Sequence, residues 1–124
     1  MTKTILFLIL IILLIIIRVI LVGSAEQGYF IMVSIGYCPC EVCCDEWADG
    51  LTYTGDIAGH GCVAIDPGAR ILKMGQRVYI EGYGEGVCND IGGAIKGWEI
   101  DLCFTTHQEA LNWGRKKVKV NIIK

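Results

Sequence analysis

The chain has 124 residues, a formal net charge of −2, and 53% hydrophobic residues. This length has room for one small domain. The acidic residues outnumber the basic ones and all lie after residue 25, whereas Lys3 and Arg18 lie before it. The balance argues against a nucleic-acid partner, because a protein that binds nucleic acid presents a basic face.

The N-terminal segment is separate from this domain. Residues 5–22 are apolar except for Arg18, with Lys3 before them and a run of small residues, Gly23-Ser24-Ala25, after them. The pattern is typical of an export signal that is cleaved after Ala25. The segment is also long enough to span a bilayer, as a helix retained in the membrane. Both interpretations export residues 26–124, to the cell wall or to the outer face of the cytoplasmic membrane.

The exported part is predicted to be mainly β. Short apolar or alternating runs separated by glycines indicate strands over residues 29–37, 62–65, 77–81, 85–88, 99–104 and 117–123. Residues 45–60 are polar and rich in glycine, which indicates a long loop. Six short strands suit a compact β-barrel.

One short helix is predicted after the fifth strand. Thr106 and Glu109 form a capping box, which marks the beginning of a helix over residues 107–113. Gly114 is suited to its C-cap. Trp113 is expected in the core, and His107, in the first turn, is expected to face solvent.

Three aspartates are the candidate catalytic residues. Asp101 lies within a strand-like alternation, where aspartate is depleted. Asp90 opens a glycine-rich segment, and Asp66 precedes Pro-Gly, so a turn would also explain each of them. If the three carboxylates converge in one cleft, they suggest acid chemistry on a sugar bond.

Several neighbours are candidates for binding the substrate. Glycine backbone lets a ligand or another strand come close, and aromatic faces suit the apolar faces of sugar rings. A lysine or histidine beside them could contact acidic groups or hydrogen-bond an aspartate, although each is as easily a solvated surface residue. The candidates are Gly92, Gly93, Lys96, Trp98, Tyr83 and His60.

The seven cysteines form two sets. The compact set CPCEVCC contains Cys38, Cys40, Cys43 and Cys44, and the dispersed set is Cys62, Cys88 and Cys103. In an exported chain the default is disulfide formation, so all seven are disulfide candidates. Zinc bound by the four thiolates of the compact set is the alternative, but the set is compressed, so we expect no metal or other cofactor. The dispersed set is equally suited to small core positions.

Three stretches resemble a known family. The sequences TGDIAGHGCVAIDP, VYIEGYG and NDIGGAIKGWEIDLCF are similar to the 3D domain, which takes its name from three aspartates. The resemblance covers about residues 35–123 and implies an RlpA-like double-psi β-barrel, related to membrane-bound lytic transglycosylase A, over residues 26–124. It places the family's aspartates on Asp66, Asp90 and Asp101. Residues 54–59 lack a lysine that members often carry there.

The resemblance implies a lytic transglycosylase that cleaves the MurNAc–GlcNAc bond of peptidoglycan to give 1,6-anhydro-muropeptides, with Asp101 as acid and then base. Peptidoglycan strands would be its partner, and the membrane a second one if the N-terminal segment is uncleaved. Two alternatives stay open. One is a cell-wall carbohydrate-binding module of the same fold without catalysis, and the other is a cysteine-rich metal or redox module.

Overall fold

The computed structural model describes residues 2–23, 28–44 and 48–124. Its elements in chain order are α1 (Thr2–Gly23), β1 (Phe30–Tyr37), α2 (Glu41–Cys44), β2 (Cys62–Ile65), η2 (Pro67–Ala69), β3 (Arg77–Ile80), β4 (Gly84–Ile91), β5 (Glu99–Cys103), α3 (His107–Trp113) and β6 (Arg115–Ile122). The prediction of a mainly β fold with one short helix near its end is confirmed. The four-residue α2, within the cysteine-rich segment, was not predicted.

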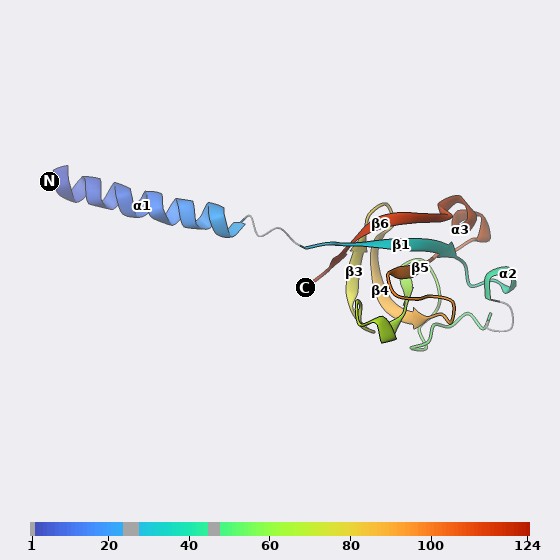
Figure 1. Ribbon diagram of the computed structural model, residues 1–124. Helices are drawn as coiled ribbons and strands as arrows, with labels where there is room; N and C mark the ends of the chain where they lie inside the picture. The colour runs from blue at the N-terminus through green and yellow to red at the C-terminus, as the bar shows by residue number, and fades with distance from the viewer. Residues whose placement is uncertain (1, 24–27, 45–47) are drawn as a thin grey trace.

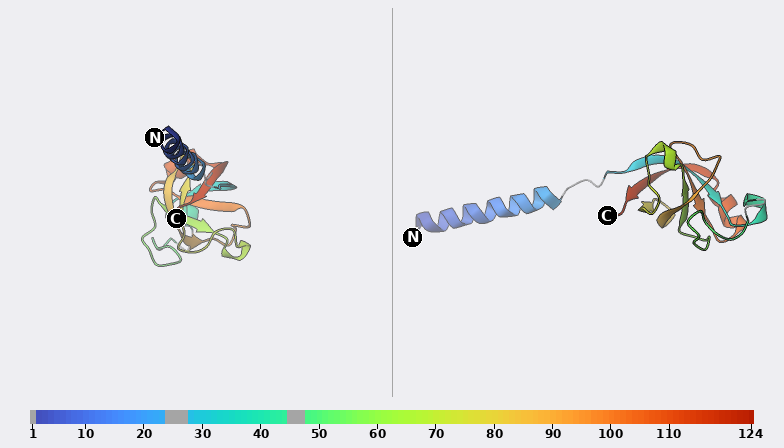
Figure 2. Two further views of the ribbon diagram at one scale, coloured as in Figure 1. Left: turned by 90° about the vertical axis from the view of Figure 1, so that its left-hand side faces the viewer. Right: turned by 90° about the horizontal axis from the view of Figure 1, so that it is seen from below.

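The six strands close into a ring in the order β1-β5-β2-β4-β3-β6. Figures 1 and 2 show the strands of this ring from three directions. Two neighbouring pairs, β1 with β5 and β2 with β4, are parallel. The other four pairs are antiparallel. Two parallel strands that pair with each other cannot be joined by a short turn, so the chain between them is long. These long connections include the loops around the ring.

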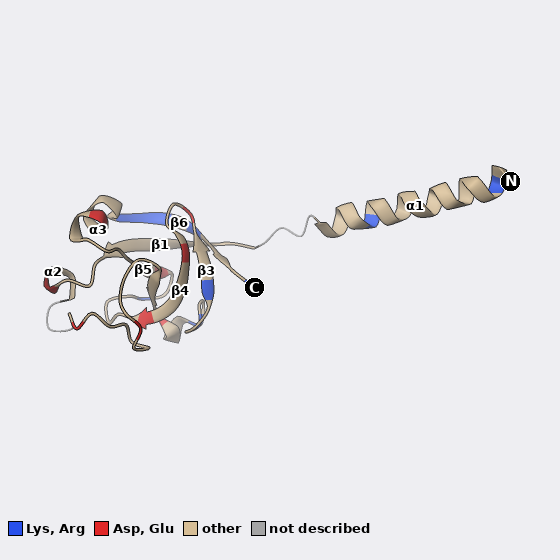
Figure 3. Cartoon of the chain, turned by 180° about the vertical axis from the view of Figure 1, so that it is seen from behind, with Lys and Arg blue, Asp and Glu red and all other residues tan. Residues whose placement is uncertain are grey.

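The inside of the ring is the hydrophobic core. Each strand supplies alternate apolar side chains to it, because successive side chains of a strand point to opposite faces. The innermost, all almost fully buried, are Val63, Ile65, Val78, Ile80, Ile100, Leu102 and Val120. In β6, Val118 and Val120 are buried while Lys117 and Lys119, on either side of Val118, are exposed, and Figure 3 shows the basic residues of this strand in blue.

Helix α3 begins and ends where the sequence predicts. The Thr106 side chain accepts a hydrogen bond from the Glu109 backbone N–H, and Gly114 is the C-cap. The helix packs on β1 at Gly36, where an added Cβ would lie 2.6 Å from the Ala110 carbonyl oxygen. A glycine is therefore required for this close approach.

Strand β4 is longer than predicted and ends at Ile91, so Asp90 lies in a strand and not in a loop. The prediction ended the strand at residue 88 because asparagine, aspartate and glycine are all depleted in strands. Pairing with β2 provides hydrogen-bond partners for this segment and overrides that local preference.

Helix α1 lies apart from the ring in Figure 1. None of its residues is buried. By length and composition it could cross a membrane, and an export signal near the N-terminus would have the same features. The predicted cleavage point at Ala25 lies outside the described residues.

Candidate functional site

Two of the three predicted aspartates flank one residue of β2. Ala64 pairs with Asp101 of β5 on one side and with Asp90 of β4 on the other. The register of β2 against β4 shifts between Val63 and Ala64, and this irregularity brings Asp90 opposite Ala64. With two strand spacings between them, the two aspartate Cα atoms are separated by about 10 Å.

A cleft with a volume of about 810 Å³ lies over these strands. Four neighbouring strands supply its floor, through Tyr37 of β1, Asp101 of β5, Ala64 of β2 and Asp90 of β4. Residues 48–53 and the cysteine-rich segment form one wall, and Gly92, Gly93 and Ile95 lie on the other side. The small Ala64 side chain leaves the space between the two carboxylates open.

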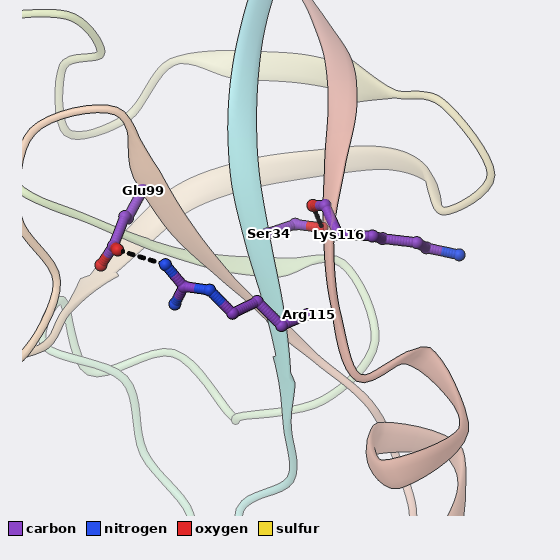
Figure 4. A network of polar contacts seen from close by, with 4 residues as sticks. All are labelled: Ser34, Glu99, Arg115 and Lys116. Atoms are coloured by element: carbon purple, nitrogen blue, oxygen red, sulfur yellow. Dashed lines mark hydrogen bonds and ion pairs between the residues drawn. The ribbon is translucent and has the colours of Figure 1, made fainter.

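The Asp101 carboxyl is suited to hold a proton. Burial raises its pKa from 3.8 to about 6, and the neighbouring Glu99 and Asp90 charges add to that rise while Arg115 opposes it. Figure 4 shows the Arg115 guanidinium paired with the Glu99 carboxylate, at 2.8 Å. This pairing neutralises part of the Arg115 charge, which therefore acts less strongly on Asp101. Oδ1 of Asp101 is buried and has no hydrogen-bond partner among the described residues.

Asp90 is held firmly by three donors. Its Oδ2 accepts from the Tyr37 hydroxyl at 2.9 Å. Its Oδ1 accepts from the backbone N–H of Tyr53 at 3.0 Å and of Ile91 at 2.9 Å. These three hydrogen bonds fix the orientation of the Asp90 carboxyl group at the cleft.

Asp66 lies outside the cleft and organises the backbone. Its Oδ1 accepts from Gly68 at 3.1 Å, at the beginning of η2, and its Oδ2 accepts from Gly97 at 3.0 Å. The Gly97 hydrogen bond lowers the pKa of this carboxyl, with smaller contributions from Gly68 and Lys96. Asp66 therefore occupies a turn, which was one of the two interpretations of its sequence. It also holds the loop between β4 and β5 through Gly97.

The predicted substrate-binding residues divide into two groups. Gly92 and Gly93 line the cleft, whereas Lys96 and Trp98 do not. Trp98 is 53% exposed and its ring contacts Phe30, with 5.9 Å between ring centroids.

Tyr83 and His60 lie elsewhere in the fold. Tyr83 is buried; its hydroxyl donates to the Cys103 carbonyl and accepts from the Gly61 N–H, each at 2.6 Å. The His60 ring stacks on Tyr83, with 4.2 Å between ring centroids, and its Nε2 donates to the Tyr83 carbonyl oxygen. Neither residue lines the cleft. Their contacts join β2 to the β3–β4 turn.

Sequence reasoning missed Tyr37 and the segment around Tyr53. Tyr37 ends β1 and donates to Asp90, and burial raises the pKa of its hydroxyl far above the ordinary value. Tyr53 belongs to the polar segment that was predicted only as a loop. A tyrosine at the end of a strand carries no signal of its function until the strand pairing places it.

The compact cysteine set gathers around a histidine. Cys38 and Cys40 are joined as a disulfide. The His107 Nδ1 atom lies 3.6 Å from Sγ of Cys38, 3.6 Å from Sγ of Cys40 and 3.4 Å from Sγ of Cys43. The expectation that His107 faces solvent is wrong, since the first turn of α3 aims its ring at these sulfurs.

The dispersed cysteines are core residues. Cys62, Cys88 and Cys103 are buried thiols, and none of them is in a disulfide. Burial raises the pKa of the Cys88 thiol to about 11 and that of Cys103 to about 12. Such thiols are poor nucleophiles and pack as small apolar side chains.

Comparison with known proteins places these features in a family. The family model described as the 3D domain matches residues 61–124. The chain is 44% identical over 61 residues to the cell wall-binding protein YocH of Bacillus subtilis, covering 49% of this chain and 21% of that protein. It is 34% identical over 84 residues to the putative cell wall shaping protein YabE of the same organism, covering 68% of this chain and 20% of that protein. The chain thus spans about a fifth of the length of these relatives.

A solved structure is also similar. The crystal structure of MltA from E. coli matches with a TM-score of 0.49 and 23% sequence identity, over 60% of this chain and 27% of that one.

Proposed function

Because the chain belongs to the 3D domain family, we propose that it cleaves peptidoglycan as a lytic transglycosylase, at the bond between N-acetylmuramic acid and N-acetylglucosamine. The observation that carries this proposal is Asp101. It is a carboxyl with a pKa of about 6 on the floor of a cleft, and one of its oxygens has no partner among the described residues.

The proposed reaction needs one carboxyl that acts twice. Protonated Asp101 donates its proton to the glycosidic oxygen, and the bond from that oxygen to the muramyl C1 breaks. The resulting Asp101 carboxylate takes the proton of the muramyl 6-hydroxyl, whose oxygen bonds to C1 and closes the 1,6-anhydro ring. Water is not consumed, and Asp101 ends protonated. A pKa near the working pH suits a group that must both give and accept a proton.

Asp90 would stabilise the positive charge that develops on the sugar ring as the bond breaks. Its three hydrogen bonds fix both carboxylate oxygens, so it need not reorganise during the reaction. Gly92 and Gly93, at the cleft edge, would let the glycan approach the backbone closely. Lys96 and Trp98 would contact more distant parts of the strand, and Asp66 would act by holding the loop that carries them.

We also propose that residues 26–124 work outside the cytoplasmic membrane, with residues 1–25 as export signal or anchor. The apolar α1 and the cell-wall names of the two relatives support this location. Two parallel pairs, separated by one antiparallel pair in a closed ring of six strands, are consistent with a double-psi β-barrel.

The test is digestion of purified peptidoglycan followed by mass spectrometry of the released muropeptides. We expect 1,6-anhydro products from the native chain and at least a 100-fold lower rate from Asp101→Asn, the loss typical of removing a general acid. Glu85→Gln is the matched control, because it neutralises one carboxylate of β4 that is exposed and paired with Arg77. Anhydro products at the native rate from Asp101→Asn would refute the role of Asp101.

A cell wall-binding module without catalysis is the second candidate. The name of the relative YocH favours it. Co-sedimentation with purified wall separates the two functions, since a binding module would sediment with wall and release no anhydro-muropeptides. In that case Asp101→Asn would leave binding to the wall unchanged or strengthen it. The substitution removes a buried carboxyl group, and asparagine has the same shape as aspartate.

A further inference from the structure

We propose that Cys38, Cys40, Cys43 and His107 form a structural zinc site. One ligand atom from each residue, three Sγ atoms and Nδ1, lies within 4.8 Å of all the others. This site is separate from the carboxylates of the cleft, although Cys43 also lines the cleft wall. It does not depend on the proposed cleavage of peptidoglycan.

The distances from the histidine match a tetrahedral ion. With zinc–sulfur bonds of about 2.3 Å and a zinc–nitrogen bond of about 2.0–2.1 Å, tetrahedral angles place the nitrogen about 3.5 Å from each sulfur. The observed distances from Nδ1 to the three sulfurs are 3.6, 3.6 and 3.4 Å. Nδ1 thus lies at the distance from each sulfur that the fourth ligand of such a site would have, and zinc would bind the reduced thiolates of Cys38 and Cys40, whose sulfurs are bonded to each other in this structure.

Local structure brings the three cysteines together. Cys38 directly follows β1. The backbone N–H groups of Cys43 and Cys44 both donate to the Cys40 carbonyl oxygen, at 3.1 and 2.9 Å, and this turn folds Cys43 back towards Cys40. The resulting Sγ–Sγ distance between Cys38 and Cys43 is 3.4 Å. The spacing from Cys40 to Cys43 is the C-x2-C spacing common among zinc ligands.

The histidine comes from a distant part of the chain and is placed by α3. Thr106 caps the helix, which fixes the first turn, and His107 is the first helical residue. Packing of α3 on β1 then brings His107 to the end of that strand, where Cys38 lies. Zinc bound here would tie the cysteine-rich segment to α3 and would hold one wall of the cleft in place.

The ligand chemistry selects the metal. Three thiolates and one imidazole in a tetrahedral arrangement suit zinc, and four protein ligands close the site to water and substrate. Its role would then be to stabilise the fold, since binding free energy of a structural metal adds to folding free energy. Calcium and magnesium prefer oxygen ligands and would not bind here.

A disulfide between Cys38 and Cys40 is the competing state of the same residues. The two states exclude each other, because a sulfur in a disulfide is no longer a thiolate ligand. The two states also differ in whether they involve Cys43 and His107. The disulfide uses neither residue, whereas the zinc site needs both.

The experiment measures metal in the full chain, purified in detergent without added metal or chelator. We expect about one zinc ion per chain by elemental mass spectrometry. Replacing zinc with Co²⁺ should give the intense visible bands of tetrahedral cobalt and the near-ultraviolet thiolate bands, a readout that needs no variant.

Cys43→Ser and His107→Gln should each lower zinc affinity by at least 10-fold in competition with a chelator. Cys44→Ser is the matched control and should keep native affinity, because Cys44 directs its Sγ to the Cys38 carbonyl oxygen. Unchanged affinity in the Cys43 and His107 variants would refute the ligand set. Native protein that lacks zinc and carries a Cys38–Cys40 disulfide in peptide mapping would overturn the proposal.

Discussion

The charged form of Asp101 is disfavoured both by burial and by neighbouring carboxylates. Burial raises its pKa, and Glu99 and Asp90 raise it further. Glu99 is two residues earlier on the same strand, so its side chain lies on the same face of β5 as that of Asp101. Arg115 reduces the effect of Glu99 by pairing with it at 2.8 Å. The protonation state of Asp101 thus depends on a neighbour that takes no part in the proposed chemistry.

The first prediction concerns the pH dependence of cleavage. The proposed reaction begins with protonated Asp101, so the rate should fall as the pH rises above about 6. Glu99→Gln should move this fall to lower pH, because it removes a negative neighbour and releases Arg115, and both changes favour the Asp101 carboxylate. The measurement is the rate of anhydro-muropeptide release from purified wall against pH. A shift to higher pH in Glu99→Gln would contradict this electrostatic account.

The second prediction concerns stability. The pKa of Asp101 is raised on folding from 3.8 to about 6, so its contribution to stability is fully present below about pH 4 and is lost as the pH rises through 6. Asp101→Asn has no such group to ionise. Its free energy of unfolding relative to the native chain should therefore be higher at about pH 8 than at about pH 4. Urea unfolding at both pH values measures this, and an equal difference at both would contradict it.

Single residues also show the limit of sequence reasoning. Asp101 was identified as a carboxyl within a strand because its neighbours alternate, and alternation is a local property. His107 was misplaced because its partners lie 64 to 69 residues earlier in the chain. Tyr37 was missed for the same reason, since Asp90 is 53 residues away. Contacts of this range follow from strand pairing, which a single sequence does not determine.

The packing of helix α3 against strand β1 depends on one glycine. An added Cβ on Gly36 would meet the Ala110 carbonyl oxygen at 2.6 Å and the Trp113 Cβ at 3.1 Å. These are backbone and inner side-chain atoms, so the helix itself would have to move away. The hydrogen bond from Trp113 Nε1 to Ser34 Oγ, at 3.0 Å, would weaken with it.

The third prediction is that Gly36→Ala lowers the free energy of unfolding by about 1–3 kcal/mol, the usual cost of overpacking. It should also weaken zinc binding, because α3 carries His107. Gly59→Ala is the control, since a Cβ there meets nothing within 4 Å. Denaturant unfolding and chelator competition are the measurements. Equal effects from the two variants would show that the close approach of α3 to β1 is unimportant.

Most elements were predictable from local patterns. The capping box and the C-cap glycine predicted α3 at its observed bounds. Alternation predicted β6 only from residue 117, although it begins at Arg115, directly after the helix. Strand β4 was cut short because its last residues favour turns, and pairing with β2 holds them extended. The order of strands in the ring was not derivable from these patterns, because five of its six pairs join strands that are not consecutive along the chain.

At the scale of the whole molecule, the ring and α1 are independent. No side chain of α1 is buried, whereas every strand of the ring contributes buried residues. Helix α1 therefore adds nothing to the core.

The fourth prediction is that a chain beginning at Gly28 folds as the full chain does. Its unfolding midpoint should agree with that of the full chain within about 2 °C in the same detergent, since no buried apolar area is lost. Thermal unfolding followed by near-ultraviolet circular dichroism measures this. A midpoint lower by about 5 °C or more would mean that α1 stabilises the ring by at least about 1 kcal/mol.

The register shift between Val63 and Ala64 has a consequence for how the length of β4 can change during evolution. Because of the shift, Asn89 turns its amide to Asp56 at 3.0 Å, and Asp90 reaches the cleft opposite Ala64. Removing Asn89, the extra residue of β4, would restore regular pairing and keep Asp90 opposite Ala64, yet it would delete the amide that contacts Asp56. We therefore expect descendants with a shortened β4 to keep the fold and the acid at the cleft but to lose this contact between β4 and the segment around Asp56.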